Sequence, residues 1–246
     1  MCKDGEMVDD LARVDVSVVA RLLAERPRAD MAVALLGGRA LSAGELARAA
    51  GVSPSAATAH LARLESGGVV FAEARGRHRI FGLAGPAYAA VIEAMLAVAP
   101  RRPVHSLSAD RRSEQLRRAR SCYDHLAGTL AVACYERLFD VGFLHAAGQG
   151  RPEVTDAGAR WFRGLGVPMD DLAARRRPLT RACMDWTERR HHLAGALGAA
   201  LLTHLLQTGA VARKPGCRAL TVTCDDTELL DRLLPPAGQA PAPVEE

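Results

Sequence analysis

The segment from Leu41 to Leu83 constrains the fold most strongly, because it predicts two short helices around a tight turn, followed by a hairpin. Ser42 precedes Glu45 by three residues, which is the spacing of a capping box at the start of a helix. Gly51 supplies the positive φ that a turn between two helices requires. Ser53, placed directly before a proline, gives the second helix its N-cap.

In the predicted second helix, apolar residues recur at helical spacing, which places Ala57, Leu61 and Leu64 on its inner face. The positions left to face outward are Ser55, Ala56, Thr58, Ala59 and Ala62. Two apolar stretches, Val69–Phe71 and Ile80–Phe81, then predict the strands of a hairpin whose turn holds a glycine and several basic residues.

This order is typical of a winged helix-turn-helix, in which the second helix enters the major groove of DNA. A hairpin with arginines at its tip can contact phosphates or the minor groove. The outward face is poor in long side chains, so we expect phosphate contacts and DNA shape to supply much of the affinity. The predicted DNA-contacting residues are Ser53, Ser55, Ala56, Thr58, His60, Arg63, Arg75, Arg77, His78 and Arg79.

The string TAHLARLESGGVV resembles the S-x-H-L-x-x-L-x-x-x-G-L-V signature of the ArsR-type (arsenic-repressor-like) regulators, with Thr58 at the serine and His60 at the histidine. The preceding RADMAVALLGGRALSAGELARAAGVS is similar to the lead-in helix and first motif helix of that family. The resemblance covers about residues 10–98. It implies DNA binding by a symmetric dimer, built from a helix near Val8–Glu25 and another at Pro86–Ala99.

Two departures from that family concern metal ions. Members that bind arsenic or cadmium in the first motif helix carry a C-x-C element there, whereas this chain has GELARAAG. Members that bind zinc at the dimer helix carry spaced His and acidic residues, whereas PAYAAVIEAMLAVAP offers only Glu93. The metal ligands of the family therefore have no counterparts at these places.

Composition favours a mainly helical protein. The 246 residues are 49% hydrophobic but only 4% aromatic, so the core is expected to consist mostly of Ala, Leu and Val. The net charge of +4 fits nucleic-acid binding without proving it. The polar start MCKDGEMVDD and the lack of a long apolar run predict a cytoplasmic protein with no membrane partner. No P-loop, dinucleotide fingerprint or G-x-S-x-G motif is present, and we expect no enzyme activity.

The second half contains an internal duplication. HLAGTLAVACYERLFDVGFL, which starts at His125, aligns without gaps with HLAGALGAALLTHLLQTGAV, which starts at His192. Each copy leads to a predicted strand, in PEVTDAG and RALTVTCDD respectively, and then to an apolar stretch. The helices are rich in small and apolar residues on most faces, which indicates burial. We therefore interpret the copies as two degenerate winged-helix-like units of a sensing module rather than as further DNA readers.

The predicted fold is mainly α with small β-wings, a winged helix-turn-helix followed by a helical C-terminal domain of two winged-helix-like repeats. The expected organisation is a DNA-binding and dimerisation domain over residues 1–99, a linker over 100–112, a duplicated helical effector or interaction domain over 113–235, and a disordered tail over 236–246.

Both copies carry a cysteine, an aspartate and a histidine near the HLAG motif, in CYDHLAG and CMDWTERRHHLAG. These elements resemble those of longer ArsR-type regulators with an appended C-terminal domain. Thiolate and imidazole suit zinc, copper(I) or a haem iron, and we expect Cys122 and His125 to share one helix face. The candidate metal or effector residues are Cys122, His125, Cys183, His191, His192 and Trp186.

Other interpretations of these residues stay open. The cysteines and histidines can also be core residues kept by the duplication, which is the commoner role of such side chains. The aromatic residues Tyr123, Trp161, Phe162 and Trp186 could line a pocket for a small organic effector, although a core role is common for such side chains. Cys217, in a PGCR turn, is expected to be the most exposed thiol.

The sequence thus favours a homodimeric, DNA-binding transcriptional repressor that an effector releases. The first alternative is a winged-helix scaffold that binds proteins and does not read DNA. The second is a metal or haem sensor that uses the Cys/His residues of the C-terminal half.

Overall fold

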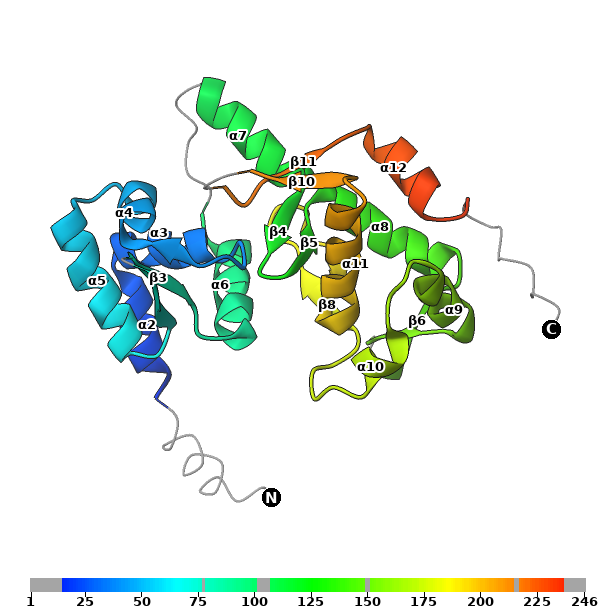
Figure 1. Cartoon of the computed structure of the whole chain (residues 1–246), viewed down its shortest axis with the longest axis horizontal. Coiled ribbons are helices and arrows are strands. Elements are labelled where there is room, and N and C mark those ends of the chain that lie inside the picture. The colour runs from blue at the N-terminus through cyan, green and yellow to red at the C-terminus, as the bar shows by residue number, and fades with distance from the viewer. Residues whose placement is uncertain (1–14, 77, 101–106, 149–150, 215–216, 237–246) are drawn as a thin grey trace, which may run out of the picture. The chain divides into compact units, whose positions relative to one another are not determined.

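The computed structural model describes residues 15–76, 78–100, 107–148, 151–214 and 217–236 (Figure 1). The chain divides into two compact units, one that ends at Ala89 and one that begins at Ala90. This division falls inside helix α6 (Pro86–Val98), whereas the sequence analysis placed the end of the first domain at residue 99. None of the described helices is both long and apolar enough to cross a membrane.

The first unit consists of helices packed against a small antiparallel sheet. Its helices are α2 (Val16–Ala24), α3 (Arg26–Leu35), α4 (Ala43–Ala50) and α5 (Pro54–Ser66). Its strands, within residues 41–76 and 78–83, are β1 (Leu41–Ser42), β2 (Val70–Arg75) and β3 (His78–Leu83). The sheet order is β1-β3-β2, so the predicted hairpin gains a third strand through the pairing of Leu41 with Phe81.

The local signals read from the sequence define both motif helices. The Ser42 Oγ accepts a hydrogen bond from the Glu45 amide at 3.3 Å, and Glu45 Oε2 accepts one from the Ser42 amide at 2.8 Å, which completes the capping box. Gly51 ends α4 with a φ of 66°. The Ser53 Oγ accepts from the Ala56 amide at 3.3 Å and starts α5. The predicted helix-turn-helix is therefore present.

The helix expected near Val8–Glu25 is described only from Val16 and ends at Ala24, where the extended backbone of Glu25 separates it from α3. The portion before residue 15 lies outside the described residues. In the second unit, α7 (Leu107–Arg118) runs through the end of the predicted linker at 100–112. All but residue 236 of the predicted tail, 237–246, lies outside the described residues.

The second unit repeats one order of elements: hairpin, helix, hairpin, helix. The first copy contains β4 (Arg120–Cys122), β5 (His125–Ala127), α8 (Thr129–Asp140), β6 (Leu144–Ala146), β7 (Pro152–Val154) and α9 (Asp156–Gly164). A short helix, α10 (Met169–Ala173), follows it. The second copy contains β8 (Arg181–Met184), β9 (His191–Ala194), α11 (Gly195–Gln207), β10 (Val211–Arg213), β11 (Leu220–Val222) and α12 (Asp226–Leu233).

The long helix of each copy packs on a hairpin of the other copy. Helix α8 of the first copy packs on β9 of the second, and α11 of the second packs on β5 of the first. Leucines of both helices, such as Leu130 and Leu197, lie in one buried cluster. In each copy the helix, hairpin and helix follow the order of α5, the wing and α6. A hairpin stands where the first helix of a helix-turn-helix would be.

The HLAG motif is a strand and a turn and does not belong to the helix that follows it. His125–Ala127 is β5, and Gly128 precedes α8 with a φ of 100°. A Cβ at Gly128 would lie 2.5 Å from the Arg117 carbonyl oxygen, so only glycine fits this turn. Gly195 takes the same role in the second copy, with a φ of 86°. Glycine at a positive φ ends the strand and turns the chain into the helix.

Candidate functional site

The outer face of α5 is the first candidate surface. Ser53, Ser55 and Thr58 are exposed near the start of the helix, while Ala57, Leu61 and Leu64 are buried beneath them. The Thr58 hydroxyl donates to the Pro54 carbonyl at 3.0 Å, which leaves its oxygen free to accept. Ala56 is half-buried beside this face. Small polar groups are thus presented on a helix whose opposite side is fixed in the core.

Farther along α5, two predicted contacts lie beside Glu25, the residue between α2 and α3. His60 is half-buried, with its Nδ1 3.6 Å from a Glu25 oxygen. Arg63 is exposed and lies 3.6 Å from the other oxygen, while Arg28 forms an ion pair with Glu25 at 2.8 Å. The hydrogen bond from Arg28 is the main cause that lowers the pKa of Glu25.

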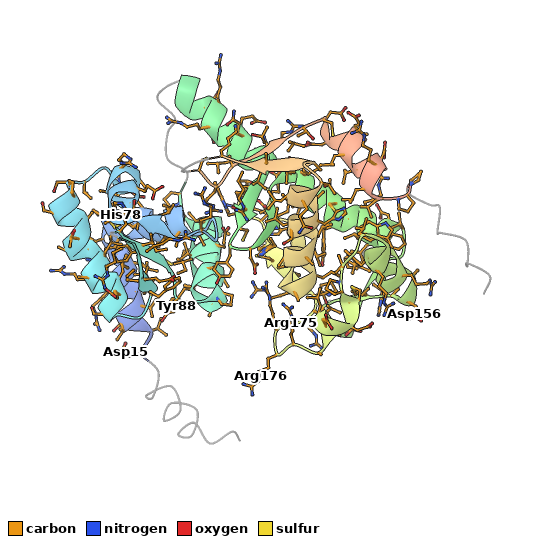
Figure 2. All side chains as sticks on the ribbon, viewed as in Figure 1. Asp15, His78, Tyr88, Asp156, Arg175 and Arg176 are labelled. Atoms are coloured by element: carbon orange, nitrogen blue, oxygen red, sulfur yellow. The ribbon has the colours of Figure 1, made fainter. Side chains whose placement is uncertain are left out.

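The wing presents part of the expected basic tip. Arg75 and His78 are exposed and face each other across the β2–β3 turn, where Gly76 has a φ of 60°. Figure 2 labels His78 on β3. Arg79 is bound to Glu65 of α5 and lies over the Phe81 ring at 5.3 Å, so it braces the wing against α5. Arg77 lies outside the described residues.

The second candidate site is a buried cluster of two cysteines and two histidines. Cys122 lies opposite His125 on the β4–β5 hairpin, and Cys183 lies opposite His192 on the β8–β9 hairpin. The expected shared helix face of Cys122 and His125 was therefore wrong; they are cross-strand neighbours. One Cys Sγ or His ring nitrogen from each residue lies within 4.8 Å of the other three, and none of the four residues is more than 8% exposed.

The geometry inside this Cys/His cluster is compact. The two Sγ atoms are 4.0 Å apart. The two imidazole ring centroids are 5.1 Å apart with planes inclined by 32°. The turn of the first hairpin holds Tyr123 at a φ of 58°, and the loop of the second holds Arg189 at 55°. A positive φ is costly for a side chain of this size, so the surroundings must hold both turns in place.

Each histidine of the cluster has an aspartate beside it. His125 Nδ1 is 3.3 Å from Asp124 Oδ1, and Arg177 Nη2 donates to the same oxygen at 3.0 Å. Burial alone would raise the pKa of Asp124, but the hydrogen bonds from His125 and Arg177 outweigh it and lower the pKa to about 2. Asp124 is therefore ionised and orients His125.

Asp185 plays the matching part for His192, whose Nδ1 lies 3.5 Å from its Oδ2. The carboxylate is wholly buried, pairs with Arg120 at 2.9 Å and accepts from the Gly128 amide at 2.7 Å. Burial opposes its ionisation, yet the Arg120 charge and the hydrogen bonds it accepts hold the pKa of Asp185 below its usual range. Since Gly128 belongs to the other copy, Asp185 also ties the two repeats together.

A second buried ion pair lies next to Cys122. Arg218 Nη2 donates to Glu93 Oε1 of α6 at 2.7 Å, and Arg218 Nε donates to the Ser121 carbonyl at 3.3 Å. The Ser121 amide in turn donates to the Arg218 carbonyl at 3.0 Å. Glu93, which the sequence analysis noted as the one acidic residue of its helix, is thus ion-paired with Arg218, more than a hundred residues later in the chain.

The two thiols of the cluster differ in acidity. The hydrogen bond from Cys122 is the largest cause that lowers the pKa of Cys183; burial opposes it, and the imidazoles of His125 and His192 add to it. The same thiol–thiolate contact, together with burial, raises the pKa of Cys122. Cys183 is therefore the more acidic thiol of the pair.

The remaining candidates lie apart from the cluster. His191 is exposed and lines a shallow surface pocket, together with Tyr135, Glu136, Phe139, Asp140, Met184, Arg189 and Arg190. Trp186 is half-buried, with the Arg120 guanidinium 4.8 Å from its ring centroid. Trp161 stacks on Phe143 at 5.2 Å and contacts Phe162, so these aromatic rings belong to the core.

Sequence reasoning did not find the arginines that support the cluster. The repeated C-x-D spacing pointed to Asp124 and Asp185, which accompany the cysteines in both copies. The same repeat could have marked Arg120, because an arginine stands two residues before the cysteine in both copies. Nothing comparable marks Arg177 or Arg218, because their pairing with carboxylates depends on contacts between distant segments. A buried arginine looks like any surface arginine in a sequence.

Comparison with known proteins supports the first unit as a DNA-binding module. Residues 37–70 match a family model described as winged helix-turn-helix DNA-binding. The uncharacterized HTH-type transcriptional regulator YdfF of Bacillus subtilis is 38% identical over 209 residues, which cover 85% of this chain and 92% of the relative. The similarity to this regulator therefore extends through both units.

Two solved structures resemble part of the chain. Reduced HlyU from Vibrio cholerae is 27% identical and covers 39% of this chain and 98% of its own, with a TM-score of 0.34. The homodimeric winged helix-turn-helix DNA-binding domain of Mb0332 from Mycobacterium bovis is 26% identical and covers 40% of this chain and 89% of its own, with a TM-score of 0.33.

Proposed function

Because the chain belongs to the winged helix-turn-helix transcriptional regulators, we propose that it acts as a homodimeric repressor on double-stranded DNA and is released by an effector. The observation that carries this proposal is the capped pair α4 and α5, joined at Gly51, with the start of α5 exposed. The second unit is the proposed effector module. The ArsR-type resemblance of residues 10–98 agrees with this arrangement.

In the proposed complex, α5 lies in the major groove with its N-terminal end toward the bases. Ser55 and Thr58 are exposed and can hydrogen-bond to base edges or phosphates. Arg75 and His78 at the wing tip are placed to meet the backbone. Arg63 has its charge partly balanced by Glu25, and His60 is half-buried beside the same carboxylate, so both are weaker candidates.

The proposed dimer uses apolar residues that lie on exposed helix faces. Val91, Met95 and Val98 of α6 recur at spacings of four and three and are 45%, 46% and 83% exposed. On α2, Val16 and Val18 are also exposed. A stripe of this kind is a costly surface for a monomer, and a second copy of the chain is the partner that the ArsR-type resemblance implies.

DNA binding is tested by fluorescence anisotropy with labelled duplexes from the region upstream of the gene and with random duplex, at two salt concentrations. We expect log K to fall steeply with log salt, because the protein displaces counterions from phosphates. Arg75→Ala should weaken binding to all sequences alike, whereas Thr58→Val should change the preference among sequences. Arg160→Ala, an exposed arginine on α9, is the matched control and should bind normally.

The absence of binding even at low salt would overturn the proposal and favour the protein-interaction scaffold. If Arg160→Ala weakened binding as much as Arg75→Ala, the wing would have no special role. The dimer is tested separately by light scattering with Met95→Glu, which should shift the protein toward monomer. Met184→Glu is the control, because Met184 is similarly exposed, at 40%, but lies on β8.

A further inference from the structure

We propose that Cys122, His125, Cys183 and His192 form a tetrahedral site for a divalent ion of the zinc class, which fastens the two repeats to each other. The proposal goes beyond DNA binding and does not depend on it. None of the four residues lies in the helix positions at which the ArsR-type resemblance would place a metal.

The donor set and its dimensions fit such an ion. Two thiolates and two imidazoles form one of the common ligand sets of structural zinc. With Zn–S bonds of about 2.3 Å and Zn–N bonds of about 2.0 Å, the donors of a tetrahedral site are roughly 3.3–3.8 Å apart. The two sulfurs are 4.0 Å apart, and all four donor atoms lie within 4.8 Å of one another. Small side-chain rotations close the site around an ion.

The histidines independently indicate a missing partner. His125 is 3% exposed and His192 is wholly buried. His125 Nε2 and His192 Nε2 have no hydrogen-bond partner within the described part of the chain, and His192 Nδ1 has only the Asp185 carboxylate beside it, at 3.5 Å. A buried polar atom without a partner costs about 1–3 kcal/mol, so two such atoms in one place are unusual. A coordinated ion would satisfy His125 Nε2 and one nitrogen of His192.

The residues around the cluster are arranged as they are around other metal ligands. A histidine that binds a metal through one nitrogen usually has a carboxylate or carbonyl at the other, which fixes the ring. Asp124 lies at Nδ1 of His125, and Asp185 lies at Nδ1 of His192, at 3.3 and 3.5 Å. The two carboxylates come from the same C-x-D position of each copy, so the duplication has kept ligand and support together.

Charge balance selects a divalent ion. The nearby carboxylates of Asp124, Asp185 and Glu93 are each paired with an arginine and leave no net charge for the site to neutralise. Two thiolates carry two negative charges, so a divalent ion gives a neutral cluster, which is the form that a buried position favours. Copper(I) would leave one uncompensated negative charge. Haem does not fit four converging donors, because the porphyrin occupies all but the two axial positions.

Four protein ligands close the coordination sphere, so the ion has a structural role and leaves no position for a substrate. Two of the ligands come from β4–β5 and two from β8–β9, one Cys and one His from each hairpin. The ion would therefore join two hairpins that are separated by most of the first copy. It would add to the contacts that α8 makes with β9 and α11 makes with β5.

The test begins with the full chain, purified under reducing conditions without chelator, and its metal content measured by mass spectrometry. We expect about one zinc per chain. After removal of zinc, added Co²⁺ should produce the intense visible absorption of a tetrahedral site and the near-ultraviolet bands of thiolate coordination. The double variant Cys122→Ser/Cys183→Ser should lose both signals, whereas Cys217→Ser/Cys224→Ser should keep them.

A second variant is needed in case the double variant Cys122→Ser/Cys183→Ser fails to fold. Asp124→Asn keeps all four ligands and should weaken zinc affinity about 10- to 100-fold in competition with a chromophoric chelator, with circular dichroism unchanged. A folded wild-type chain that binds neither zinc nor Co²⁺ would overturn the proposal. Equal metal content in the two double variants, or a stoichiometric preference for copper(I), would overturn it as well. Metal content is measured without DNA, so this outcome is independent of repression.

Discussion

At the scale of single residues, the second unit holds several of its charges in buried pairs. Glu93 is 2% exposed and Arg218 is 9% exposed, and their contact joins α6 to the strand that carries Cys122. Removing one member of such a pair leaves the other charge buried without compensation. The intact pair adds little to the free energy of unfolding, whereas removal of one partner lowers that free energy strongly.

Glu93→Gln should lower the free energy of unfolding by about 3–5 kcal/mol, because the Arg218 charge stays buried without a counterion. Urea unfolding followed by fluorescence measures this change. Asp170→Asn is the matched control: it breaks the exposed pair of Asp170 and Arg163, and its effect should be small. Comparable decreases in the free energy of unfolding of the two variants would show that burial of the ion pair does not determine the size of the effect.

Thiol reactivity should separate two cysteines that lie outside the cluster. Burial raises the pKa of Cys134 to about 12, so almost none of this thiol is ionised at neutral pH. Cys217 is exposed, as the sequence predicts. Brief alkylation of the native protein followed by peptide mapping should label Cys217 and leave Cys134 unmodified until denaturant is added. Early labelling of Cys134 would mean that α8 opens readily.

At the scale of elements, the turn between α4 and α5 depends on one glycine. Gly51→Ala places a Cβ in open space but at a φ of 66°, so the expected loss of about 1–2 kcal/mol comes from the backbone alone. Gly44→Ala, two turns earlier in α4, should instead stabilise by about 0.4–1 kcal/mol, since no positive φ is required there. Thermal unfolding by circular dichroism distinguishes the two signs. A gain from Gly51→Ala would contradict the left-handed turn.

The first unit was predictable because its signals are local. Ser42, Glu45, Gly51 and Ser53 each act on residues within one helical turn, and all four fulfil their predicted roles. The third strand, β1, was missed because two residues, Leu41–Ser42, give no periodic pattern. Helix caps and turns can therefore be predicted from a sequence, whereas the pairing of very short strands cannot.

The members of the Cys/His cluster could be predicted from the sequence, but their local geometry could not. The duplication singled out Cys122, His125, Cys183 and His192, and the structure brings them together. Their local geometry was misread, because HLAG precedes an apolar helix and looks continuous with it. The close approach of Gly128 to the Arg117 carbonyl, which forces the strand to end there, is a contact that the sequence pattern does not contain.

At the scale of the whole molecule, the two compact units should unfold in separate transitions. Both tryptophans, Trp161 and Trp186, lie in the second unit, so their fluorescence reports on that unit alone. Glu93→Gln should shift the fluorescence midpoint in urea, whereas Gly51→Ala should shift only part of the circular dichroism signal. Equal shifts of the fluorescence midpoint in both variants would show that the units unfold as one.

The even division of the Cys/His cluster between the repeats has a consequence for how the cluster assembles. Each hairpin contributes one cysteine and one histidine, so one copy by itself holds half of the four donors. A chain with a single copy could complete the set only by meeting another such chain, at a rate and extent set by its abundance in the cell. With both copies in one chain, a fixed local concentration takes the place of that encounter, and the cluster forms regardless of how many molecules are present.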